Sequence, residues 1–110
     1  MERWNINDGP TFNPMNEAHP RAEVKISDRF RGGFIHYHEG ENVVVFEWEF
    51  GGSVTALIWG AKAEEWDKLY PWAVGRQAEI YECVAKEAIR QKSPASTYET
   101  DLISGFITIR

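Results

Sequence analysis

Apolar and polar residues alternate along the first half of the chain. This period of two recurs in residues 23–27, 34–39, 43–50 and 53–59, and short glycine-containing or polar stretches separate these segments. Successive side chains of a β-strand point to opposite faces, so a period of two residues is typical of strands. The pattern predicts four consecutive strands joined by hairpins.

The second half of the chain changes to helical spacing. Trp66, Leu69 and Tyr70 predict a short amphipathic helix that Pro71 ends. A longer helix is expected from residue 75 or 76 to residue 92. Its apolar face consists of two adjacent rows, Ile80, Val84 and Ala88 beside Tyr81, Ala85 and Ile89. A final pair of strands is expected on the two sides of a turn at Ser104-Gly105.

These elements predict one α+β domain over residues 1–110, because the 110 residues match the usual size of a single domain and show no internal repeat. The expected sheet is antiparallel, with a four-strand meander and a C-terminal strand pair. One long and one short helix pack on one of its faces. Residues 1–21 contain Pro10, Pro14 and Pro20 and are interpreted as an irregular N-terminal arm.

The two faces of the sheet follow from the register of the hairpins. Two-residue loops at Gly40-Glu41 and Gly51-Gly52 would place one set of side chains toward the helices: Ile35, Tyr37, Val44, Phe46, Trp48, Phe50, Leu57 and Trp59. The opposite face would carry Phe34, His36, His38, Val43, Val45, Glu47, Glu49, Val54, Ala56 and Ile58. The second set is too apolar for an ordinary solvated face and too polar for a core.

Three interpretations of this second face remain open. The structural one is a solvated sheet with cross-strand pairs such as His36 with Glu47. In the second interpretation the face binds a protein partner or a second copy of the chain, through Phe34, His36, His38, Val43, Val45, Glu47, Glu49 and Ile58. Glutamates at positions 39, 41, 47 and 49 would then attract a basic partner.

The third interpretation is a metal site. His36 and His38 lie on the same side of one strand, and Glu47 on the next strand could complete a set of two histidines and one carboxylate. His19 lies in the arm at no defined distance from them. The chain has no HExxH, Walker, GxGxxG, CxxC or GxSxG motif, so no cofactor is expected.

The net charge of the chain indicates which kinds of partner are disfavoured. The net charge of −5 disfavours nucleic acid and anionic membranes, because both attract positively charged surfaces. A single cysteine, Cys83, excludes an intramolecular disulfide, and its position on the long helix predicts a small buried or half-buried apolar residue that is not a nucleophile. The N-terminal sequence has no apolar region of the kind a secretory signal needs.

Together these features predict a small cytoplasmic protein without enzymatic activity that binds another protein. The most concrete form of this prediction is an inhibitor or an immunity-type protein that neutralises a basic partner. The alternative is a small metal-dependent or ligand-binding enzyme that uses His36, His38 and Glu47.

Overall fold

The chain forms a seven-stranded antiparallel sheet in the computed structural model, which describes residues 4–5 and 22–110. The strands are β1 (Trp4–Asn5), β2 (Ala22–Arg29), β3 (Gly32–Glu39), β4 (Asn42–Phe50), β5 (Ala56–Trp59), β6 (Tyr98–Asp101) and β7 (Phe106–Ile109). Their order in the sheet is β1-β2-β3-β4-β5-β7-β6. The predicted α+β fold, with a meander and a C-terminal strand pair, is confirmed. Within the predicted arm, β1 pairs with β2, and the rest of the arm lies outside the described residues.

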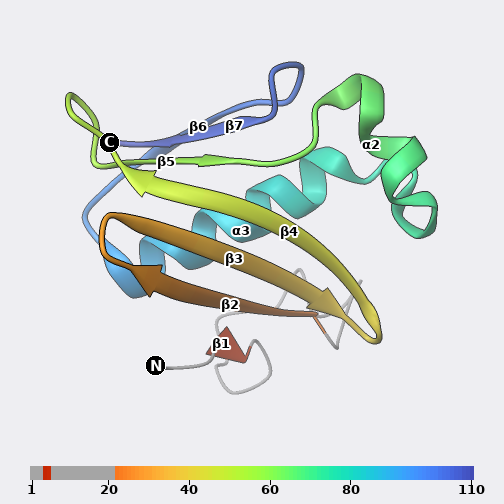
Figure 1. Ribbon diagram of the computed structural model, residues 1–110, viewed down its shortest axis with the longest axis horizontal. Coiled ribbons are helices and arrows are strands. Elements are labelled where there is room, and N and C mark those ends of the chain that lie inside the picture. Colours follow the sequence, from red (N-terminus) through yellow and green to blue (C-terminus); the bar gives the residue numbers. More distant parts are fainter. Residues whose placement is uncertain (1–3, 6–21) are drawn as a thin grey trace.

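Two α-helices follow the meander: α2 (Ala63–Leu69) and α3 (Gln77–Lys92), with a 3₁₀ turn (Pro71–Ala73) between them. Figure 1 shows α3 lying along one face of the sheet and α2 near one end of the sheet. Both helices lie where the apolar spacing places them. In α2, Trp66 is buried and its indole nitrogen donates a hydrogen bond of 2.8 Å to the carbonyl of Ala73, whereas Leu69 is exposed.

The core lies between α3 and the face of the sheet that it covers. Alternate residues of the strands face Ile80, Tyr81, Val84 and Ala85 of α3, and these four helix residues are buried against them. The rings of Phe46 and Tyr81 meet edge to face, with 5.1 Å between their centroids. The Tyr81 hydroxyl donates to the carbonyl of Ala61 at 2.8 Å, and burial raises the pKa of Tyr81 to about 12. Any side chain at Gly60 would collide with Phe46, so this close contact requires glycine.

The first predicted hairpin has the predicted register. Glu39 pairs with Asn42 and Tyr37 pairs with Val44, so Gly40 and Glu41 form a two-residue loop. Gly40 has a φ of 63°, which glycine adopts at little cost and which hairpin loops of this length require. The outward and inward faces of β3 and β4 are therefore as the sequence predicts.

The predicted register of the second hairpin is wrong. The loop covers residues 51–55, and the observed partner of Trp48 is Ile58, in place of the expected Thr55. Because this offset is an odd number of residues, it exchanges the two faces of β5. Ile58 is 2% exposed in the core, while Leu57 and Trp59 point to the opposite face. The other neighbour of β5 explains the difference: Ile58 also pairs with Ile107 of β7, whose side chain must be buried.

This register predicts unequal effects of two neighbouring substitutions. Ile58→Ala would lower the free energy of unfolding by about 2–5 kcal/mol, because it leaves a cavity in the core. Leu57→Ala should cost clearly less, because Leu57 is only partly buried on the other face. Urea denaturation of the two variants measures both values. A larger loss for Leu57→Ala would contradict the observed register.

Candidate binding face of the sheet

The face of the sheet that points away from α3, here called the outer face, carries a mixture of aromatic, aliphatic and charged side chains. The register places on it Glu23, Lys25, Ser27 and Arg29 of β2, Phe34, His36 and His38 of β3, Val43, Val45, Glu47 and Glu49 of β4, Leu57 and Trp59 of β5, Phe106 and Thr108 of β7, and Glu99 and Asp101 of β6. All the binding residues predicted from the sequence lie here except Ile58, which is buried on the helix side.

One row of side chains crosses this face at right angles to the strands. Glu47 pairs with Phe34 on one side and with Trp59 on the other, and Trp59 in turn pairs with Phe106. The rings of Trp59 and Phe106 lie 6.4 Å apart, and Phe106 is an exposed aromatic residue. A carboxylate therefore lies between aromatic side chains on a surface that the described helices do not cover.

Sequence reasoning missed Trp59, Leu57 and Phe106 as members of this face. The alternation in Phe106–Ile109, where Ile107 and Ile109 are buried, was a usable signal for Phe106. No comparable signal existed for Trp59, because its direction depends on the pairing of β5 with both β4 and β7.

The two histidines lie side by side on β3. Their rings stack with 6.0 Å between centroids and an interplanar angle of 25°. The ring of Phe34 lies next to that of His36, with 6.4 Å between the two centroids. Partial burial, together with the charges of Lys25 and His36, lowers the pKa of His38 below its ordinary value of 6.5. His38 therefore favours the neutral form at physiological pH.

The structure does not bring His36, His38 and Glu47 together as a metal-binding set. Among residues 4–5 and 22–110 there is no group of three or more His, Cys, Asp or Glu side chains that could hold a metal ion. The register gives the reason, because Glu47 pairs with Phe34 and is only a diagonal neighbour of His36, with His38 one step further away. His19 lies outside the described residues.

Two acidic side chains on β4 are free to interact with a partner. Glu47 and Glu49 are exposed, and in the described part of the chain neither makes an ion pair or a hydrogen bond. They are separated by one residue on the same side of the strand, so their charges add. By contrast, Glu99 on the same face pairs with Arg110 at 3.4 Å.

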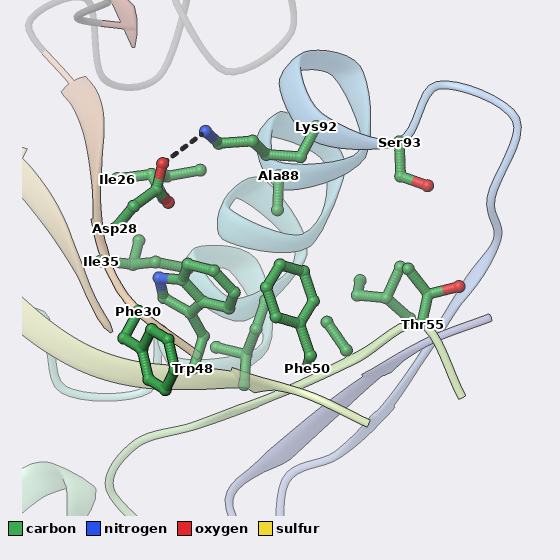
Figure 2. Close-up of a pocket in the computed structure, with 13 residues that line it drawn as sticks. Ile26, Asp28, Phe30, Ile35, Trp48, Phe50, Thr55, Ala88, Lys92 and Ser93 are labelled. Atoms are coloured by element: carbon green, nitrogen blue, oxygen red, sulfur yellow. Dashed lines mark hydrogen bonds and ion pairs between the residues drawn. The ribbon is translucent and has the colours of Figure 1, made fainter. Parts of the chain in front are cut away.

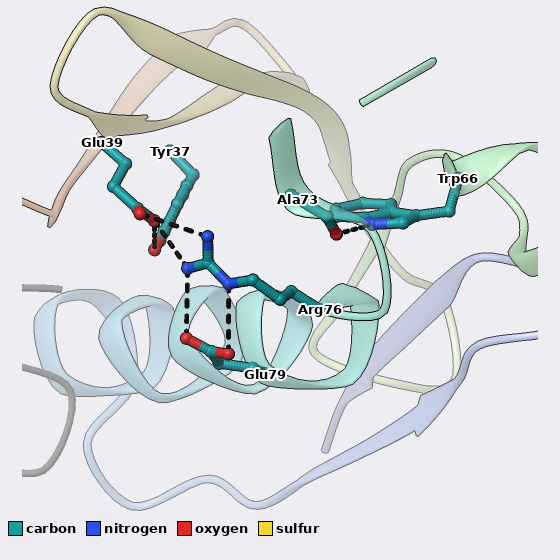
Figure 3. A network of polar contacts seen from close by, with 6 residues as sticks. All are labelled: Tyr37, Glu39, Trp66, Ala73, Arg76 and Glu79. Carbon is teal, nitrogen blue, oxygen red and sulfur yellow. Dashed lines mark hydrogen bonds and ion pairs between the residues drawn. The ribbon is translucent and has the colours of Figure 1, made fainter. Parts of the chain in front are cut away.

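Glu39, which sequence reasoning counted among the partner-attracting acids, has a structural role. Figure 3 shows its carboxylate between Tyr37 and Arg76 on the helix side of the sheet. Arg76 donates two hydrogen bonds to it, at 2.8 and 3.2 Å, and the Tyr37 hydroxyl donates a third at 2.8 Å. Arg76 also pairs with Glu79 at 3.2 Å, so this network ties β3 to the first turn of α3. Burial and the hydrogen bond to Glu39 raise the pKa of Tyr37.

Cys83 is buried on α3, as the sequence predicts. Burial raises the pKa of its thiol, which leaves the nucleophilic thiolate form disfavoured.

Comparison with known proteins finds no relative of this chain. No family model matches it, and neither a curated protein nor a solved structure matches it. None of the helices in the described part of the chain is long and apolar enough to cross a membrane. The function must therefore be argued from the geometry of the surface.

The lowered pKa of His38 predicts a dependence of stability on pH. Because the folded state binds a proton at His38 less readily than the unfolded state, the free energy of unfolding should fall as the pH drops below about 6.5. His38→Gln should reduce this fall, which urea denaturation at several pH values would measure. NMR titration of the His38 ring in the wild type gives the direct check, and a midpoint at or above 6.5 would contradict the prediction.

Proposed function

We propose that this protein is a non-enzymatic binding module whose outer face binds a basic protein partner. The observation that carries the proposal is the row formed by Phe34, Glu47, Trp59 and Phe106, in which a carboxylate without an ion pair in the described part of the chain lies between aromatic side chains. An inhibitory or immunity-type role in the cytoplasm is the most specific form of the proposal, and the acidic net charge of −5 supports it.

The apolar part of the outer face provides the area that a partner would cover. Trp59, Phe34 and Leu57 are only partly buried, and Val45 and Phe106 are exposed. Aromatic side chains near the centre of an interface often contribute most of the binding free energy. The strands hold these side chains in fixed positions, so little conformational entropy is lost when a partner binds.

The acidic part of the outer face selects a cationic partner. A lysine or arginine placed between Trp59 and Phe34 would pair with Glu47 and also lie against the face of an aromatic ring, which attracts cations. Glu49 lies one pleat away and Asp101 lies beyond Phe106, and both add negative charge on the same side. Opposite charges across an interface mainly accelerate association and reject partners of the wrong charge.

A second copy of the chain is the alternative partner. Lys25 and Arg29 outnumber Glu23 on β2 and give this side of the outer face a net positive charge, while Glu47 and Glu49 lie toward the other side. Two copies related by a two-fold axis could place these opposite charges against each other. Sedimentation equilibrium distinguishes the two cases, because a stable dimer at micromolar concentration would identify the partner as a second copy.

Reversing the charges on β4 tests the proposal. The double variant Glu47→Arg/Glu49→Arg should form the same fold, because both residues are exposed. Its association rate with a partner captured from the native host should fall at least about tenfold at low salt, and the difference should shrink as salt increases. Stopped-flow or biosensor kinetics with the purified partner measure this rate.

Glu64→Arg/Glu65→Arg is the matched control, since it makes the same change of charge on exposed residues of α2. Circular dichroism should show both double variants folded. The proposal is wrong if the β4 variant associates at the wild-type rate, or if the α2 variant is slowed to the same extent.

A further inference from the structure

A second region that residues 4–5 and 22–110 leave uncovered lies on the opposite side of the sheet, where α3 ends. Strand β4 continues beyond the part of the sheet that the helix covers, so Trp48 is only partly buried and Phe50 is 58% exposed, although both point to the helix side. A cavity of about 360 Å³ opens there between Trp48, Phe50, Ile58 and the end of α3 at Ala88 and Lys92. Figure 2 shows Trp48 and Phe50 on one side of this cavity, with Ala88 and Lys92 on the other.

The interior of the cavity is apolar and is lined by buried side chains of the strands. Ile26, Ile35, Ile58 and Ile109 line it and are all buried, so with Trp48 and Phe50 of β4 its walls come from five strands as well as from the helix. The indole nitrogen of Trp48 donates to the carbonyl of Ser27 at 3.0 Å, which fixes the ring over Gly33. The volume is at the lower end of the range of about 300–1,000 Å³ for small-molecule sites. The cavity is therefore suited to a small hydrocarbon group.

The opening of the cavity combines aromatic rings with one carboxylate. Phe30 and Phe50 are both exposed beside it, and Trp48 and Phe50 meet edge to face with 5.1 Å between their centroids. Asp28 lies at the same opening and pairs with Lys92 at 3.2 Å. Aromatic faces close to an acidic group are the usual environment for an alkylammonium ion.

Phe30 has a positive φ angle, which phenylalanine rarely adopts. It occupies the first position of the two-residue loop between β2 and β3, the position that Gly40 occupies in the next hairpin. Its φ of 42° is unfavourable for a bulky residue, and its side chain is 98% exposed. A hydrogen bond of 3.1 Å from the amide of Phe50 to the carbonyl of Arg31 holds this loop against the end of β4. The strain and the exposure are explained if Phe30 covers a ligand.

We propose that this cavity binds a small amphipathic cation, an alkyl- or arylammonium compound. Its hydrocarbon part fills the space between Trp48 and Ala88, and its ammonium group lies between the aromatic rings and Asp28. In the free protein, the ammonium group of Lys92 occupies the position of the ligand cation beside Asp28. That ion pair lies at the surface and is weak, so a ligand can displace Lys92. The carbonyl groups at the end of α3 add partial negative charge nearby.

Three matched probes test this proposal: octyltrimethylammonium, octanol and octanoate. Each is titrated into the 110-residue chain while the resonance of the Trp48 indole N–H is followed by NMR. Octyltrimethylammonium should bind most tightly, because it alone combines the apolar chain with a positive charge. Tighter binding of octanoate, or no change at Trp48 with any probe, would overturn the proposal.

Substitutions of Asp28 and Lys92 should change the affinity for octyltrimethylammonium in opposite directions. Asp28→Asn should weaken binding of octyltrimethylammonium about fivefold and leave octanol unchanged, since the lost attraction is that of an exposed charge pair. Lys92→Met should strengthen binding of octyltrimethylammonium, because it removes the lysine cation that competes for Asp28. Glu64→Gln, on exposed α2, is the matched control and should have no effect. If Lys92→Met weakens binding of octyltrimethylammonium, Lys92 does not compete with the ligand cation for Asp28 and the proposal fails.

Phe30→Asn separates ligand binding from stability. Asparagine tolerates a positive φ better than phenylalanine, so the variant should unfold at the same temperature or a higher one. Its affinity for octyltrimethylammonium should fall roughly threefold, because one aromatic face is lost. Unchanged affinity would contradict the role of Phe30. A wild-type dimer in light scattering that dissociates in Phe30→Asn would assign the cavity to a second copy and overturn the small-molecule proposal.

Discussion

A single long helix packs against one face of the sheet, and this contact determines which strand side chains are buried and which stay exposed. Ile80, Tyr81, Val84 and Ala85 of α3 bury one set of strand side chains, and this contact supplies most of the apolar core. A helix of sixteen residues extends about 24 Å, so it cannot cover a seven-stranded sheet completely. The end of β4 therefore extends past α3, and the outer face is not covered by the described helices because α3 lies on the opposite face.

Strand β4 contributes to both uncovered regions because its side chains alternate. Glu47 and Glu49 point to the outer face, where both are exposed. Trp48 and Phe50 point to the helix side, where they form the aromatic part of the cavity. The two proposed sites therefore lie on opposite sides of one strand and share no side chain, so substitutions can test each site separately.

The polar residues of this protein differ in whether they have partners inside the fold. Arg76 binds Glu39 and Glu79 in a partly buried network that joins β3 to α3, and breaking such a network would leave charges without partners. Glu47 and Glu49 lie at the surface of the sheet without such contacts in the described part of the chain. The ion pair of Asp28 and Lys92 is intermediate, since it is formed but exposed. The two proposed sites therefore use the second and third groups.

The sequence by itself determined the α+β fold, both helices and the two faces of β3 and β4. These features depend on local periodicity and on a short loop at Gly40 that permits one pairing, which places His36, His38, Glu47 and Glu49 correctly. Only the tertiary structure decided the direction of Ile58 and Trp59, because two glycines at residues 51–52 allow loops of several lengths and β7 selects among them. The tertiary structure also decided that Glu39 pairs with Arg76. It decided too that α3, which ends at Lys92, leaves the side chain of Phe50 exposed. Those outcomes depend on contacts between residues far apart in the chain, which no local pattern records.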